Sequence, residues 1–222
     1  MVLRAVLRDL MSGRKQGALA SDKPELDSGP IVLNVGGNSK QIPIPAHYAG
    51  WRHWLLDIDP KGQPDIVCDA RELATLAPGR FDAVYCSHNL EHYYRHDAER
   101  VLAGFLHVLK PEGFAEIRVP DLKSVMEYVV ASKMDLEDVL YVCPGGPILV
   151  RDVLYGWSKQ IEQSGRDFFA HKTGFTPSSL EAILRAAGFV SIFVAERKTD
   201  FEVCALAFKS EPTATQRALL GV

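Results

Sequence analysis

IVLNV at residues 31–35 is a short, almost continuously apolar run that two glycines follow directly. Further runs of this kind are WLLDI at 54–58, DIVC at 65–68, DAVYC at 82–86 and FAEIRV at 114–119. Apolar runs without alternation are typical of strands that are covered on both faces of a parallel sheet. These five runs therefore predict the parallel part of a covered sheet.

Helical patterns lie between and after the later runs. Asp97 is suited to cap a helix, and Pro111 with its neighbours to end it. The apolar stripe of that helix consists of Ala98, Val101, Leu102, Phe105, Leu106 and Leu109. Thr176 and Pro177 predict the start of a later helix, and Gly188 its left-handed end.

Two strand-like runs close the pattern, FVSIFVA at 189–195 and EVCALAF at 202–208. The loop between them is too short for anything but an antiparallel hairpin. Strands that alternate with helices predict an α/β fold. We expect a doubly wound, mostly parallel seven-stranded sheet with a C-terminal antiparallel hairpin. Prolines around the second strand predict that the first connecting helix is short or missing; they are Pro43, Pro45, Pro60 and Pro64.

The domain organisation follows from shifts in composition along the chain. Residues 1–30 are expected to form an N-terminal helix and a linker, residues 31–210 one domain, and residues 211–222 a C-terminal tail. Within the domain, residues 122–172 are expected to form a long, irregular insertion on the substrate side. The amphipathic start, MVLRAVLRDLM, is interpreted as a helix that packs on the domain or on a partner subunit, as in a homodimer. A helix on a membrane surface is the alternative.

Composition excludes several classes of protein. The 222 residues carry a formal charge of −3, with 25 basic and 28 acidic side chains, so nucleic-acid binding is not expected. No apolar run reaches the length of a membrane span, and no secretory signal is recognisable. The four cysteines form no CxxC pair and are interpreted as reduced thiols of a cytoplasmic protein.

Chemistry-bearing residues follow three successive strand runs. In an open α/β sheet, ligands bind beyond the carboxyl ends of the strands. Gly36 and Gly37 after the first run allow close approach of a ligand to the backbone. Asp57 at the end of the second run is placed to accept the hydroxyls of an adenosine ribose, while Asp59 is expected on the opposite face. Asp69 after the third run can accept from the exocyclic amine of adenine.

The sequence resembles the class I S-adenosylmethionine-dependent methyltransferases, and especially the small bacterial members with a shortened first helix. The resemblance covers residues 31–121 and about 175–208. The stretches that carry it are LNVGGN, WLLDIDP, DIVCDARELATLAPGRFDAVYCSHNLEHY, VLKPEGFAEIRVPDL and LEAILRAAGF. It implies a Rossmann-like methyltransferase fold and S-adenosylmethionine as the cofactor.

The resemblance also implies the cofactor residues. Gly36 and its neighbours would flank the methionine part, Asp57 would hold the ribose, Asp69 with Ala70 the adenine, and Ser87 with His88 would lie beside the sulfonium. The full predicted set is Asn34, Gly36, Gly37, Asp57, Ile58, Asp69, Ala70, Ser87 and His88. The chain departs from the family pattern at Asn34, where an acidic residue is usual, and at Asn38, where a glycine is usual.

The predicted reaction is methyl transfer from S-adenosylmethionine to a small-molecule or sugar acceptor, at oxygen or nitrogen. His88 is the leading general base, because an imidazole near neutral pKa suits that task, and His171 and Asp121 are the other catalytic candidates. Residues 122–172 are expected to close over the site and to select the substrate. A non-catalytic or partner-regulating module on the same fold is the alternative. A nicotinamide-dependent enzyme is disfavoured because no GxGxxG follows the first strand.

His88-Asn89-Leu90-Glu91-His92 also matches HxxEH, a zinc motif in which His88 and His92 would bind the ion and Glu91 would act as base. That motif requires a helix, whereas here it begins at the end of a strand-like run, and no third ligand is evident. We therefore predict no metal and interpret Glu91 and His92 as residues that stabilise a helix start.

Overall fold

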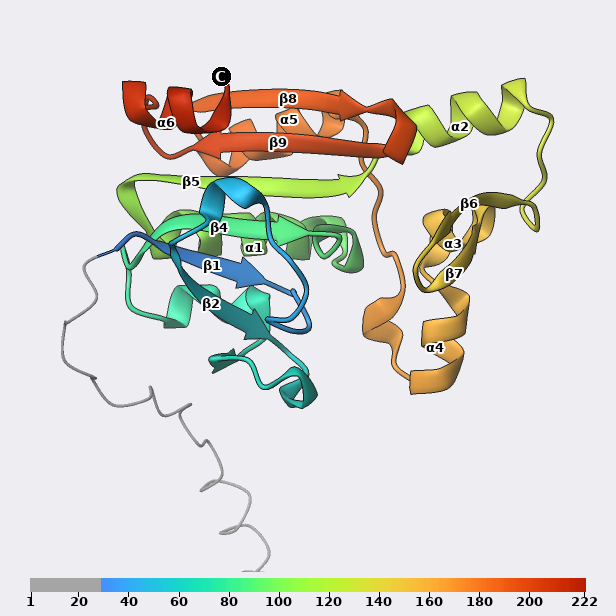
Figure 1. Cartoon of the computed structure of the whole chain (residues 1–222), viewed down its shortest axis with the longest axis horizontal. Helices are drawn as coiled ribbons and strands as arrows, with labels where there is room; N and C mark the ends of the chain where they lie inside the picture. Colours follow the sequence, from blue (N-terminus) through green and yellow to red (C-terminus); the bar gives the residue numbers. More distant parts are fainter. Residues whose placement is uncertain (1–28) are drawn as a thin grey trace, which may run out of the picture.

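A seven-stranded sheet forms the centre of the computed structural model, which describes residues 29–222 (Figure 1). Its order is β3-β2-β1-β4-β5-β9-β8. The first five strands of that order pair in parallel, whereas β9 pairs antiparallel with both β5 and β8. This confirms the predicted α/β sheet and its C-terminal hairpin.

The strands of this sheet contain or overlap the predicted apolar runs, but β5 begins before its run, at Leu109, which was expected to belong to the preceding helix. They are β1 (Ile31–Val35), β2 (Arg52–Asp57), β3 (Ile66–Val67), β4 (Phe81–Ser87), β5 (Leu109–Pro120), β8 (Ser191–Arg197) and β9 (Glu202–Phe208). The helices of the described chain are α1 (Arg95–Val108), α2 (Leu122–Ala131), α3 (Val150–Tyr155), α4 (Ser158–Ser164), α5 (Pro177–Ala187) and α6 (Ala214–Leu220).

Apolar side chains cover both faces of the sheet. On one face, α1 and α5 enclose the larger core, which includes Leu33, Val84 and Phe105. On the other face, Tyr48 of the short 3-10 turn Ala46–Tyr48 packs against Phe114 and Tyr85. This turn lies between β1 and β2 in place of a full helix, as the prolines predict.

The ends of α1 and α5 test the helix signals. Thr176 accepts from the backbone N–H of Ser179, Pro177 opens α5, and Gly188 ends it at φ +108°, as predicted. The cap predicted for α1 is wrong. That helix begins at Arg95, so Asp97 lies in its first turn, where a carboxylate still stabilises the helix dipole.

The insertion is more regular than predicted. Residues 122–172 contain α2, α3, α4 and an antiparallel pair of strands, β6 (Val139–Cys143) and β7 (Gly146–Leu149). Much of this segment lies past the carboxyl ends of the parallel strands (Figure 1). Its own apolar cluster, which includes Val125, Leu140 and Val153, explains the regularity, because a segment with a core can order itself.

The predictions for the two ends of the chain can be compared with the structure only at the C-terminus. The predicted helix at residues 1–11 and most of the predicted linker lie outside the described residues. The C-terminal segment contains α6, which Thr213 caps by accepting from the backbone N–H of Gln216. Among residues 29–222, no helix combines the length and apolarity that a membrane crossing needs.

We predict that Phe105→Ala lowers the free energy of unfolding by about 3–5 kcal/mol, because it empties a fully buried site between α1 and the sheet. Urea unfolding followed by circular dichroism measures this value. Ala103→Gly on the exposed side of the same helix is the control and costs about 1 kcal/mol. Equal losses in the two variants would contradict the assignment of this core.

Candidate functional site

A first cavity of about 240 Å³ opens beyond the carboxyl ends of β1, β2 and β4. This is the edge at which the strand-end residues were expected to meet. Its lining residues are Gly36, Asn38, Asp57, Ile58, Asp59, Asp69, Arg71, His88, Asn89, His92, Tyr93, Tyr94, Asp97, Phe168, Phe169 and Lys172. Carboxylates and aromatic rings thus share one small space.

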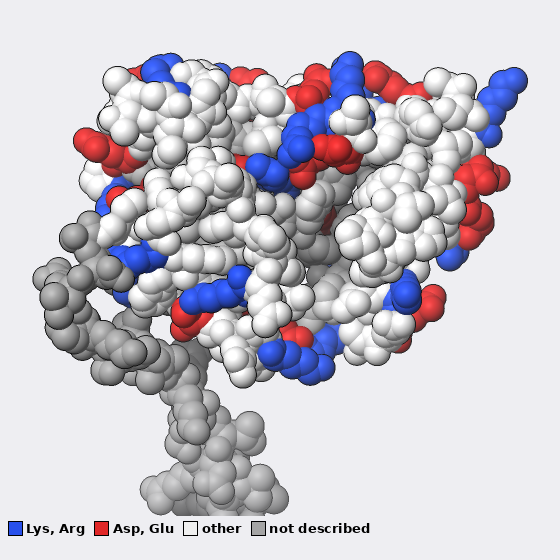
Figure 2. Space-filling view, in the orientation of Figure 1, with Lys and Arg blue, Asp and Glu red and all other residues white. Residues whose placement is uncertain are grey.

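A second cavity of about 370 Å³ lies between the sheet and the insertion, and its walls are more apolar. Tyr141, Trp157 and Phe201 contribute rings to it, and Asp152 and His171 contribute polar groups. Four residues line both cavities: Asn38, His88, His92 and Phe169. Figure 2 shows the hollow between the sheet and the insertion, with basic and acidic side chains interspersed on the face in view.

Close packing against asparagine side chains disfavours any Cβ at the two glycines of the loop after β1. Gly36 has φ +74°, and a Cβ there would lie 2.2 Å from Nδ2 of Asn89. A Cβ on Gly37 would lie 2.2 Å from Nδ2 of Asn34. Asn34 is buried beneath the loop, so neither Asn34 nor Gly37 lines a cavity, and both support the loop rather than forming the predicted ligand contacts.

Asp57 ties the β1 loop to the end of β2. Its Oδ2 accepts from the backbone N–H of Asn38 at 2.9 Å, and its Oδ1 accepts from that of Asp59 at 2.8 Å. Asp57 is nearly buried yet lines the first cavity. The expectation that Asp59 points elsewhere is wrong. Asp59 lines the same cavity and binds Arg166 at 2.9 Å, because the chain turns directly after the strand.

Asp69 follows β3 and is held by Arg71. Its carboxylate accepts from the backbone N–H of Arg71 at 2.9 Å and from the guanidinium at 2.6 Å. Burial raises the pKa of Asp69, but these hydrogen bonds outweigh it and hold the pKa below its usual value. Asp69 lines the first cavity as predicted, whereas Ala70 is buried and is not among its lining residues.

His88 stands between the two cavities with an unusual backbone, φ +49°. Its Nε2 lies 3.1 Å from Glu202 Oε2, and its Nδ1 lies 3.5 Å from Glu91 Oε1. Burial lowers the pKa of His88, but the two carboxylates prevail and raise it to about 10. A general base needs a neutral imidazole at neutral pH, so contacts that favour the charged ring of His88 do not support the predicted role.

Two further predicted residues lie outside the cavities. Asp121 is 1% exposed and caps α2, accepting from the backbone N–H of Lys123 and from the hydroxyl of Ser124. Asp121 lines neither cavity, so the structure does not support the catalytic role predicted for it. Ser87 ends β4 but lines neither cavity, which does not support the predicted contact with a sulfonium.

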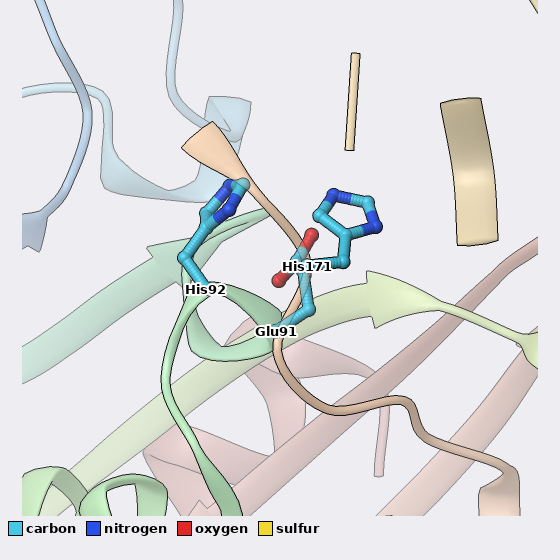
Figure 3. Close-up of side chains that lie close together, drawn as sticks. All are labelled: Glu91, His92 and His171. Atoms are coloured by element: carbon cyan, nitrogen blue, oxygen red, sulfur yellow. The ribbon is translucent and has the colours of Figure 1, made fainter. Parts of the chain in front are cut away.

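His171 lines the second cavity, as the substrate-side prediction requires. Its Nδ1 donates to the carbonyl of Val153 at 2.8 Å, which leaves Nε2 as the nitrogen with a lone pair. Burial lowers the pKa of His171, so the ring is neutral. Glu91 and His92 lie beside it, as Figure 3 shows.

Several residues in or beside the cavities were not recognised as site residues from the sequence. Asn89 packs against Gly36, and its buried Oδ1 has no hydrogen-bond partner among the described residues. Glu202 reaches His88 from 114 positions away, a contact that only the hairpin topology creates. Phe168 and Phe169 could have been noticed, because they directly precede the segment around His171 that the sequence singles out.

Comparisons with known proteins give one family. The family model described as methyltransferase domain matches residues 7–192. No curated protein sequence matches the chain. Among solved structures, the chain is similar to an S-adenosylmethionine-dependent methyltransferase from Archaeoglobus fulgidus, at 15% identity and a TM-score of 0.51, over 82% of this chain and 87% of that one. It is also similar to an O-methyltransferase family protein from Burkholderia thailandensis, at 10% identity and a TM-score of 0.52, over 82% of this chain and 52% of that one.

We predict that Asp152→Asn destabilises the insertion at neutral pH. The Asp152 carboxylate accepts from the backbone N–H groups of Leu149 and Ser158 and from the Ser158 hydroxyl. Burial raises the pKa of Asp152, but these bonds outweigh burial and hold the pKa below its usual value. The stabilisation is therefore present above an unfolded-state pKa of about 3.9 and is lost as pH falls through the lower folded-state pKa.

The expected loss at pH 7 is about 1.5–3 kcal/mol, the usual contribution of hydrogen bonds to a charged group. Urea unfolding across a pH series measures it, and the difference between wild type and variant should shrink below about pH 4. A difference that stays constant with pH would contradict an ionised Asp152 in this role.

Proposed function

Because the chain belongs to the methyltransferase domain family, whose class I members use S-adenosylmethionine, we propose that the first cavity holds this cofactor and the second holds the methyl acceptor. The acceptor that we propose is a small molecule or a sugar, methylated at oxygen or nitrogen. The observation that carries the proposal is that the two cavities share the walls Asn38, His88, His92 and Phe169. Methyl transfer requires such a junction, because donor and acceptor must meet in line.

The residues of the first cavity fit the cofactor chemically. Gly36, at φ +74°, lines this cavity with backbone alone, because Asn89 packs where its Cβ would stand. The unpartnered Oδ1 of Asn89 can accept from the ammonium group of the methionine part. Asp57 can accept from ribose hydroxyls, while Tyr93 and Phe168 offer aromatic surface for the adenine. Asp69 supports adenine binding less than predicted, because Arg71 already occupies its carboxylate.

Catalysis would depend mainly on positioning. The sulfonium of the bound cofactor supplies an already activated methyl group, so the protein must align the acceptor and exclude water. Aromatic side chains of the insertion, Trp157 and Tyr141, surround the acceptor space. The free Nε2 of His171 can accept a hydrogen bond from a hydroxyl or amine of the substrate. This bond would orient the lone pair of the substrate oxygen or nitrogen toward the wall that the two cavities share. His88, held by Glu91 and Glu202, would position rather than deprotonate.

The alternative is a cofactor-binding but non-catalytic module. Its motivation is the departure of the β1 loop from the family pattern at Asn34 and Asn38. Both residues have structural explanations, since Asn34 packs under Gly37 and Asn38 has a left-handed backbone at φ +57°, which asparagine tolerates. A cytoplasmic location, a homodimer and the absence of nucleic-acid partners stay predictions from the sequence.

We predict that Asp57→Ala weakens binding of S-adenosylhomocysteine more than tenfold, because a ribose hydroxyl loses a charged acceptor that contributes about 1.5–3 kcal/mol. Isothermal calorimetry measures the dissociation constant. Asp82→Ala is the matched control, since Asp82 also accepts from a backbone N–H, that of Ile31, but lies outside both cavities. Equal affinities for wild type and Asp57→Ala would contradict the ribose assignment.

We predict that His171→Ala lowers the rate of methyl transfer by about 10²-fold or more while the affinity for S-adenosylhomocysteine changes little. The assay follows transfer of labelled methyl groups from S-adenosylmethionine to a panel of small alcohols, amines and sugars. Transfer by wild type to none of these acceptors, together with tight cofactor binding, would favour the non-catalytic alternative. An equal loss of rate and of cofactor affinity would contradict the placement of His171 in the acceptor cavity and assign it to cofactor binding.

A further inference from the structure

We propose that Glu91, His92 and His171 bind one divalent transition-metal ion on the wall of the second cavity. This inference rests on the proposed function, because it assigns the metal to the space that receives the acceptor. Each of the three side chains offers one ligand atom, and these atoms lie within 4.8 Å of one another (Figure 3). The set is two imidazoles and one carboxylate, a common combination for zinc and for non-haem iron.

Glu91 is the first observation that points to a cation. Its side chain is 2% exposed, and neither carboxylate oxygen has a hydrogen-bond partner among the described residues. A buried carboxylate without partners is costly unless a cation compensates its charge. The nearest basic side chain, His88, forms a long ion pair with Oε1 at 3.5 Å, but its shorter contact, at 3.1 Å, is to Glu202, so one imidazole is shared by two carboxylates.

The two histidines are oriented as metal ligands usually are. Nδ1 of His92 donates to the carbonyl of Ala170 at 3.2 Å, and Nδ1 of His171 donates to the carbonyl of Val153 at 2.8 Å. A ligating histidine commonly donates its second ring N–H to a backbone carbonyl, which fixes the tautomer and the ring. In both rings Nε2 is thereby left free to bind a metal, and with the metal bound the acceptor would contact the ion in place of His171 Nε2.

The main chain holds the three residues together. The carbonyl of Glu91 accepts from the backbone N–H of Lys172 at 2.8 Å and from that of Thr173 at 3.2 Å. The end of the insertion is thus fastened to the 3-10 turn Leu90–His92, which follows β4. Ligands around a tetrahedral zinc ion lie about 3.4 Å apart, so small side-chain rotations suffice to close the site.

These contacts change the interpretation of the HxxEH motif. The sequence pairs His88 with His92, but His88 is held by Glu202 and is not part of the cluster. The third residue is His171, which only the folded chain brings near. All three line the second cavity, so coordination positions left open would face the acceptor. A metal there could bind an acceptor hydroxyl or amine and favour its deprotonated form.

The test measures zinc bound to tag-free, metal-depleted protein by calorimetry and elemental analysis. We expect one zinc per chain in wild type and an affinity lower by about tenfold or more in Glu91→Gln and in His171→Gln. His96→Gln is the control, because its imidazole is 80% exposed and lies outside the cluster. No zinc binding to wild type, or equal binding to all four proteins, would overturn the proposal.

Binding of S-adenosylhomocysteine to the same samples separates this proposal from the proposed function. Retained cofactor binding in Glu91→Gln and His171→Gln shows that the variants are folded and that their loss of zinc is specific. Zinc binding without cofactor binding in wild type would overturn the proposed function and leave the metal site standing. Cofactor binding without zinc binding in wild type would overturn the metal site and leave the proposed function standing.

Discussion

The Asp57 carboxylate is the constraint on which the site depends. It accepts from the backbone N–H groups of Asn38 and Asp59 and so fixes the loop after β1 to the turn after β2. The backbone N–H of Gly36 adds a 2.8 Å bond to the carbonyl of Leu56 at the same place. The floor of the first cavity is therefore built from two neighbouring strand ends that these hydrogen bonds hold in a fixed relative position.

The second half of the site comes from the insertion. Its end is bonded to the carbonyl of Glu91, and His171 thereby reaches a space beside His88 and His92. In the proposed function, the sheet edge holds the cofactor and the insertion encloses the acceptor, an arrangement that suits group transfer between two molecules. The aromatic side chains of the insertion would then select the acceptor.

Much of the fold follows from the sequence because its signals are local. Continuous apolar runs mark the strands, and Thr176, Pro177 and Gly188 delimit α5. The structure does not support the roles predicted for Asp121 and His88, for a local reason in the first case and a non-local reason in the second. Asp121 is used by the helix that it caps, and His88 meets Glu202, a residue on the distant hairpin. The association of Glu91, His92 and His171 likewise depends on how the insertion returns to the sheet, which no spacing in the chain reveals.

A crystal structure with S-adenosylhomocysteine tests the central claim most directly. The account predicts the ribose against Asp57, the amino-acid part over the loop at Gly36, and the sulfur toward the shared wall at His88 and Asn38. The second cavity would then be open to the sulfur and free for the acceptor. A ligand seated in the second cavity, or one whose sulfur faces away from that wall, would contradict the account.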